Sequence, residues 1–127
     1  TIADFYDIAV GHHKSYDGQK GYPIDFDNLH SPQKLFIDLI TICDTLDAAT
    51  DNLGRNYART KQFKEVLEEL NSEKGSRYSD SIVDLILNDD ELQIQLEELL
   101  NSREESYRQV FEIIDSELRE FQTKQTI

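Results

Sequence analysis

The sequence predicts an all-α fold, a helical bundle followed by a long C-terminal amphipathic helix. Apolar residues recur at helical spacing in the segments between the turns. Both prolines and three of the five glycines lie within residues 11–32, whereas residues 89–123 contain neither. With 127 residues the chain suits one domain with a modest core. We therefore expect short helices around one long loop, and a long helical segment at the end.

The first helix is expected over residues 1–13, so that the adjacent His12 and His13 lie at its C-terminal end. Its helical spacing is carried by Ile2, Phe5, Tyr6, Ala9 and Val10. Glycine and proline then predict a loop over residues 15–31. Loops of this length in a compact domain are often functional.

The central helix is expected to begin at Ser31 and Pro32, because serine is a preferred N-cap and proline suits the first helical position. It should run to about Thr50. Apolar residues cover so much of its surface that we expect it at the centre of the core. They are Leu35, Phe36, Leu39, Ile40, Ile42, Cys43 and Leu46.

Two shorter helices should follow. Residues 60–70 carry apolar side chains at i, i+3, i+4 and i+7, which is typical of an amphipathic helix. Residues 71–76, which include a glycine, predict a turn. Ser79 and Asp80 then predict the N-terminal cap of a short helix that ends near Leu87.

The last third predicts one long helix, or two helices with a break near residues 101–102. Its apolar residues fall near a heptad rhythm that Arg103 interrupts, namely Leu92, Leu96, Leu99, Tyr107, Val110, Ile114, Leu118 and Phe121. Residues 89–123 are therefore either a homodimer surface or a strip that packs back on its own domain. We divide the chain into residues 1–88 and an extension, residues 89–127.

Composition restricts the partners. The chain has 26 acidic and 13 basic residues, a net charge of −13, which repels DNA, RNA and anionic membrane surfaces. No apolar run approaches the roughly 20 residues that a membrane helix needs. Cys43 is the single cysteine, so a reducing, cytoplasmic setting is expected.

Three polar residues form a candidate metal site. A histidine pair alone is weak evidence for metal binding, but imidazole suits iron, manganese and zinc. Asp44 interrupts the apolar stripe of the central helix, where a lone carboxylate is costly unless it is paired or bound to metal. Asp47 lies one turn further along. The alternative interpretation is a solvated helix edge.

Arg55 and Arg59 carry guanidinium groups that suit phosphate oxygens. Alternatively, these residues lie on the surface at the start of a helix and form ordinary ion pairs.

The order of these segments resembles the C-terminal half of an HD-GYP domain, a branch of the HD superfamily of metal-dependent phosphohydrolases. HHKSYDGQKGYP (residues 12–23) is similar to the family stretch HHE-x-x-DG-x-GYP. DTLDA (residues 44–48) resembles its AD-x-x-DA helix, and RNYAR (residues 55–59) its R-P-Y-R segment. Residues 63–83 resemble the closing helices around a G-x-x-F-D-P turn, so the likeness covers about residues 5–88.

The resemblance implies an HD-type helical bundle, present in part, that hydrolyses cyclic di-GMP or another small phosphodiester with two or three divalent ions, most often iron or manganese. It implies His12, His13 and Asp44 as metal ligands. Substrate would be held by Asp47, Arg55 and Arg59. The loop beside the site would be shaped by Asp17, Gly18, Gly21, Tyr22 and Pro23.

The sequence departs from the family in several places. The namesake His-Asp pair lies upstream of the HH motif in the family, and the eleven residues before His12 contain no histidine. Lys14 replaces a glutamate, and Asp38 stands where arginine is common. We therefore expect a fragment of a longer enzyme with little turnover of its own. The alternatives are an inactive HD-like module that dimerises or binds partners, and a nucleotide sensor.

Overall fold

A computed structural model of the chain describes residues 2–50 and 62–125. The helices in these ranges are α1 (Ile2–Gly11), α2 (Lys34–Thr50), α3 (Phe63–Ser72), α4 (Asp80–Leu87) and α5 (Asp90–Gln125). The described residues contain no strand, only two isolated bridges, one in the first loop and one before α4. The all-α prediction is confirmed.

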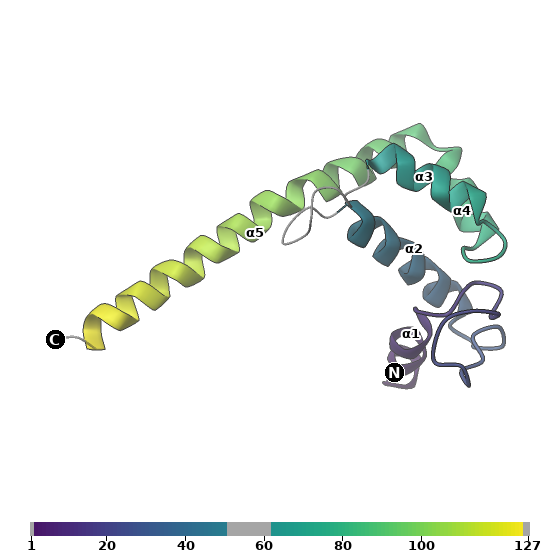
Figure 1. Ribbon diagram of the computed structural model, residues 1–127, viewed down its shortest axis with the longest axis horizontal. Coiled ribbons are helices and arrows are strands. Elements are labelled where there is room, and N and C mark those ends of the chain that lie inside the picture. Colours follow the sequence, from purple (N-terminus) through teal and green to yellow (C-terminus); the bar gives the residue numbers. More distant parts are fainter. Residues whose placement is uncertain (1, 51–61, 126–127) are drawn as a thin grey trace.

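The helices pack in chain order, so that each contacts the next (Figure 1). α2 lies between α1 with its following loop on one side and α3 on the other. α3 and α4 form an antiparallel pair, and α5 begins beside α4 and then extends far beyond the other helices. The resulting body is a small helical assembly with one projecting arm.

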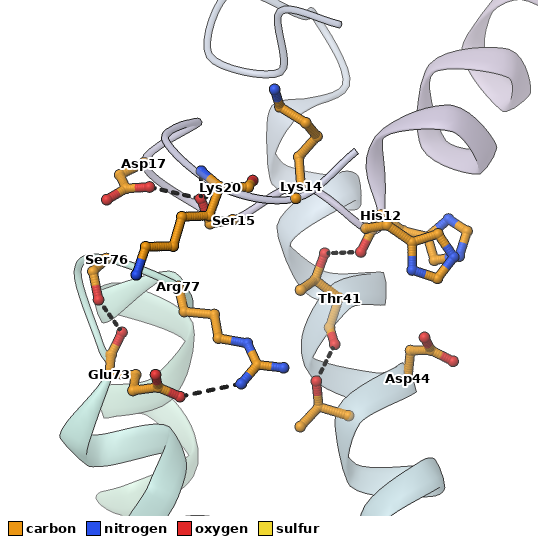
Figure 2. A pocket seen from close by; sticks show the side chains of 13 residues that line it. His12, Lys14, Ser15, Asp17, Lys20, Thr41, Asp44, Glu73, Ser76 and Arg77 are labelled. Atoms are coloured by element: carbon orange, nitrogen blue, oxygen red, sulfur yellow. Dashed lines mark hydrogen bonds and ion pairs between the residues drawn. The ribbon is translucent and has the colours of Figure 1, made fainter. Parts of the chain in front are cut away.

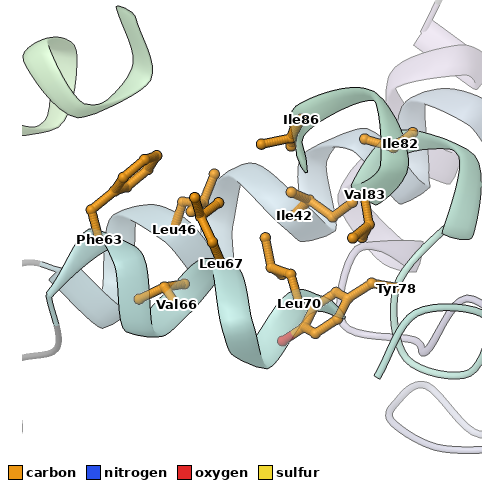
Figure 3. Close-up of a cluster of buried hydrophobic side chains, with 10 residues drawn as sticks. All are labelled: Ile42, Leu46, Phe63, Val66, Leu67, Leu70, Tyr78, Ile82, Val83 and Ile86. Carbon is orange, nitrogen blue, oxygen red and sulfur yellow. The ribbon is translucent and has the colours of Figure 1, made fainter. Parts of the chain in front are cut away.

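The core lies where α2, α3 and α4 meet (Figure 3). α3 contributes its i, i+3, i+4, i+7 stripe as predicted, because all four of those side chains are buried. Leu92, Leu96 and Leu100 of α5 pack against the same cluster, so the first turns of α5 belong to the body. The buried cluster consists of Ile42, Leu46, Phe63, Val66, Leu67, Leu70, Tyr78, Ile82, Val83 and Ile86.

The prediction that the whole apolar surface of α2 lies in the core is wrong. Ile37, Ile42 and Leu46 are buried, whereas Leu35 and Phe36 are 63% and 53% exposed. Leu39, Ile40 and Cys43 are exposed as well. The stripe is wider than one helix can bury when neighbours cover only part of its circumference.

The start of α2 also differs from the prediction. The helix begins at Lys34, and Ser31 lies in a turn before it. The Ser31 hydroxyl accepts the N–H of Gln33 at 3.1 Å and donates to Oδ2 of Asp7 at 2.6 Å. Serine therefore ties the loop to α1 instead of capping α2. At α4 the predicted cap is present, since the Ser79 hydroxyl accepts the N–H of Ile82.

α5 is a single helix without a break at residues 101–102. Its first half packs back on the body, which is one of the two predicted interpretations. The contact extends as far as Arg103, which bonds Asp47 and Thr50 of α2. Beyond Arg103 the apolar side chains of α5 are exposed. None of the described helices is both long and apolar enough to cross a membrane.

Candidate functional site

The pocket at the junction of the first loop, α2 and the turn before α4 has a volume of about 480 Å³ (Figure 2). It brings together segments that are far apart in the sequence. The lining residues are His12, His13, Lys14, Ser15, Asp17, Lys20, Gly21, Thr41, Asp44, Thr45, Glu73, Ser76 and Arg77.

His12, His13 and Asp44 offer ligand atoms that all lie within 4.8 Å of one another. The histidines directly follow α1, and Asp44 projects from the middle of α2. Oγ1 of Thr41 donates to the carbonyl oxygen of His12 at 2.9 Å, and Thr41 precedes Asp44 by about one helical turn. This hydrogen bond holds the end of α1 beside the carboxylate. Asp44 itself is exposed, because this side of α2 is not covered, so the prediction of a costly buried carboxylate is wrong and the residue lies on a solvated helix edge.

Neighbouring groups orient both imidazole rings. Nδ1 of His12 lies 2.7 Å from the carbonyl oxygen of Ala9. Because a carbonyl only accepts, Nδ1 carries the proton in this bond, so Nε2 is the nitrogen that faces a ligand. The His13 ring stacks on Tyr22 with centroids 4.7 Å apart and an interplanar angle of 20°. A hydrogen bond from the other ring nitrogen to a carbonyl oxygen, as at His12, is typical of metal-binding histidines.

The three side chains could hold a divalent cation if they moved closer together. Ligand atoms about 2.1 Å from one ion lie only about 3.0 Å apart at neighbouring octahedral positions, well inside the 4.8 Å that spans these atoms. Two imidazoles and one carboxylate on one side of an ion form the arrangement that iron(II) sites use, with the remaining positions open. A second nearby group of three ligands is not found among the described residues.

Gly21 lets the loop approach the histidines closely. Its φ is +91°, and a Cβ atom on Gly21 would lie 2.1 Å from the backbone oxygen of His13. Lys14 and Gly21 form an antiparallel bridge that closes the loop. Gly18 also has positive φ, +73°, and the Tyr22–Pro23 peptide bond is cis. Of the predicted loop residues, Asp17 and Gly21 line the pocket, whereas Gly18, Tyr22 and Pro23 are not among its lining residues.

Asp17 lines the pocket but serves the loop. Its Oδ1 accepts the Ser15 hydroxyl at 2.7 Å and the N–H of Gln19 at 3.0 Å. The Ser15 hydrogen bond, followed by the Gln19 bond, lowers the pKa of Asp17 below its ordinary value. The carboxylate is thus committed to holding the turn around Gly18.

The loop is fastened to the turn before α4. The N–H groups of Tyr16 and Asp17 donate to the carbonyl oxygens of Arg77 and Ser76, both at 2.9 Å. Nζ of Lys34 donates to the carbonyl oxygen of Tyr16 at 2.6 Å. These bonds connect the histidine wall to residues 76–77 and so create the second wall of the pocket.

Lys20 and Arg77 are pocket residues that the sequence analysis did not assign. Both lie on the side of the pocket away from Asp44 (Figure 2). Arg77 pairs with Glu73 at 3.3 Å, a long and largely exposed ion pair that an anionic ligand can replace. The sequence signal is the stretch Gly75–Tyr78, which lies where the family has its turn but by itself indicates no role.

Other expected site residues lie elsewhere. Asp47 does not line the pocket, because its carboxylate binds Arg103 of α5 at 2.6 Å. Arg55 and Arg59 lie outside the described residues. Lys14 is buried, and its Nζ donates to the carbonyl oxygen of Ile24 at 3.3 Å.

Comparison of the chain with protein-family models, curated proteins and solved structures gives no match.

Proposed function

We propose that the chain forms part of a metal-dependent phosphohydrolase of the HD or HD-GYP type, with cyclic di-GMP as the favoured phosphodiester. The observation that carries this proposal is the cluster of His12, His13 and Asp44, whose ligand atoms lie within 4.8 Å of one another. The motif resemblance selects the same three residues from the sequence alone.

Iron(II) or manganese(II) is the metal that we propose for this cluster, because two imidazoles and one carboxylate leave open coordination positions. When bound, such an ion supplies Lewis acidity and activates water for attack on phosphorus. The hydrogen bond from Nδ1 of His12 to Ala9 and the stacking of His13 on Tyr22 orient the two rings.

The basic side chains of Lys20 and Arg77 favour the binding of an anionic substrate. The pocket is lined by three basic residues (Lys14, Lys20, Arg77) and three acidic residues (Asp17, Asp44, Glu73), so it is near neutral apart from its histidines, although the chain carries −13. A divalent ion makes the local charge positive. A phosphate between the metal and Arg77 would then receive charge-assisted hydrogen bonds from the guanidinium.

Metal content of the purified chain tests the proposal most directly. Elemental analysis, without chelator or affinity-tag metal, should find about one equivalent of iron or manganese per chain. His13→Ala and Asp44→Asn should each lower the manganese affinity by at least about tenfold in calorimetric titration. His30→Ala is the matched control, because that exposed imidazole pairs with Asp27 and lies outside the pocket.

A chain that binds no iron, manganese or zinc contradicts the metal site. Equal losses of affinity in His13→Ala and His30→Ala would contradict the ligand assignment instead.

The substrate is tested separately, by titrating cyclic di-GMP into the manganese-loaded chain. Arg77→Ala should weaken this binding about tenfold without changing the metal content. Binding is the appropriate measurement, because the described residues hold one three-ligand cluster and the family uses two or three ions.

The second candidate function is a catalytically inactive HD-like module that dimerises through residues 89–123. The exposed apolar side chains of α5 beyond Arg103 favour it. A chain that forms dimers but binds neither metal nor cyclic di-GMP would support this function over the enzyme.

A further inference from the structure

The distal half of α5 carries an uncovered apolar stripe with coiled-coil spacing. Its members follow one another at alternating intervals of four and three residues, which is the a/d pattern of a two-helix seam. Each of these side chains is more than half exposed. We name the set the distal stripe, and it consists of Tyr107, Phe111, Ile114, Leu118 and Phe121.

The distal stripe continues the buried face of the same helix. Leu100 packs against the core, and Tyr107 lies seven residues further on. Seven residues return to the same face of a helix within about 20°. The side of α5 that the body covers up to Arg103 is therefore the side that carries the uncovered stripe further along.

We propose that the distal stripe pairs with the distal stripe of a second copy of the chain in antiparallel orientation. The inference rests on the proposal above that α5 is a dimer surface, and it adds the direction and register of the pair. A self-complementary interface is what a two-fold dimer requires.

The position of the body excludes a parallel pair. In a parallel pair, residues 92–100 of the second copy would run along the face of α5 that the core already covers. The two bodies would then compete for the same space. In heptad terms Arg103 would also face Arg108 of the second copy, which brings like charges together. An antiparallel partner instead keeps its body at the far end of the stripe.

Charge selects the register of the antiparallel pair. When Phe111 faces Ile114 of the second copy, Tyr107 faces Leu118, and the seam contains four apolar layers. Arg108 then lies beside Asp115 of the second copy, and by symmetry this attraction occurs twice. A register shifted by seven positions also has four apolar layers, but it places Asp115 against Asp115 and Glu117 against Glu117. The first register avoids that repulsion.

Light scattering with size-exclusion chromatography tests the stripe. The full chain should have twice the chain mass of 14.8 kDa. Ile114→Glu should return it to the monomer mass, because the charge lies in the seam. Ile113→Glu is the matched control, since Ile113 is 65% exposed and Ile114 is 60% exposed, but Ile113 lies outside the stripe. A monomeric wild type, or equal effects of the two substitutions, would overturn the dimer surface.

Charge reversal tests the direction and register. Arg108→Glu and Asp115→Arg should each weaken the dimer about tenfold, and the double variant should restore it. Far-UV circular dichroism checks that the helix survives, because Arg108 also pairs with Glu105 and Glu112 in its own helix. A dimer that Arg108→Glu strengthens would be parallel and would overturn the inference. A dimer insensitive to either single reversal would overturn the register.

These outcomes are separable from the fate of the metal site. The substitutions lie far along α5, and none of these residues lines the pocket. Metal content should be the same in every α5 variant. The pairing can therefore fail while the phosphohydrolase proposal stands, and the reverse also holds.

Discussion

Gly21 determines how closely the loop can approach the two histidines. Its positive φ alone favours glycine, and the space beside it excludes any side chain, since a Cβ would lie 2.1 Å from the His13 oxygen. Both constraints act on the residue that forms a bridge with Lys14 and lies next to Tyr22. The loop thus has little freedom to accept another residue at this position.

Gly21→Ala should therefore destabilise the chain by more than about 2 kcal/mol, because it combines backbone strain with a backbone clash. Gly75→Ala is the control, since Gly75 also has positive φ, +87°, but a Cβ atom there would meet no atom of the described residues within 4 Å. The control should cost only about 1–2 kcal/mol. Urea denaturation measures both, and equal costs would contradict the close approach at His13.

Residue spacing explains why some site residues could be predicted and others could not. The resemblance selected His12, His13 and Asp44 in order, and the structure brings them together. Asp47 was expected beside Asp44, but three residues advance a helix by about 300°, so the two side chains diverge by about 60°. That difference directs Asp47 toward Arg103. Lys20 and Arg77 were missed because only tertiary hydrogen bonds bring their segments together.

At the scale of elements, Lys34 joins α2 to the loop through its bond to the Tyr16 carbonyl and also pairs with Asp38 within α2. Asp38 is 6% exposed and accepts Nζ of Lys34 at 2.8 Å. The same ammonium group donates to the Tyr16 carbonyl and lies 4.4 Å from the centre of the Tyr16 ring. Burial raises the pKa of Asp38, and the bond and attraction to Lys34 only partly oppose that rise.

This raised pKa predicts the pH dependence of stability. Between the ordinary value of 3.8 and the raised value, the folded chain binds more protons at Asp38 than the unfolded chain does. The free energy of unfolding contributed by Asp38 should therefore fall as pH rises through that window. Denaturation of wild type and Asp38→Asn across the acidic range measures the difference.

Asp27 provides a control of opposite sign. The hydrogen bond from His30 lowers the pKa of Asp27, so its contribution is present above 3.8 and is lost as the pH falls. The difference in the free energy of unfolding between wild type and Asp27→Asn should therefore rise with pH. The rise should be small, because the pair is exposed. A difference between wild type and Asp38→Asn that grows with pH would contradict the dominance of burial at Asp38.

The existence and order of the helices could be predicted from apolar spacing, because each amphipathic segment buries one face. Boundaries at α2 could not, because Ser31 bonds Asp7, which lies on a different element. The excess apolar width of α2 was visible in the sequence. Which part of it would be covered depends on the number of neighbouring helices, and local sequence does not encode that number.

At the scale of the whole molecule, Arg103 attaches the arm to the body. Its guanidinium bonds the Asp47 carboxylate at 2.6 Å, the Asp47 carbonyl at 3.0 Å and Oγ1 of Thr50 at 3.0 Å. It is the last such contact with the body along α5 in the described part of the chain. The direction in which the distal stripe projects therefore depends on this residue.

Arg103→Ala should lower the free energy of unfolding by about 1–2 kcal/mol, because three hydrogen bonds to a partly buried guanidinium are lost. Arg119→Ala is the control, since Arg119 is 78% exposed and pairs with Asp115 in its own helix. Its cost should be below about 0.5 kcal/mol. Equal costs in urea denaturation would show that Arg103 does not anchor the arm.

The two backbone hydrogen bonds from Tyr16 and Asp17 to residues 76–77 also have a kinetic consequence. They join positions about sixty residues apart, so the chain must close a large loop before they form. Contacts of such long range are expected late in folding. The amide protons of Tyr16 and Asp17 should therefore exchange with solvent whenever α3 and α4 detach from the loop, and their protection would report when both walls of the pocket are in place.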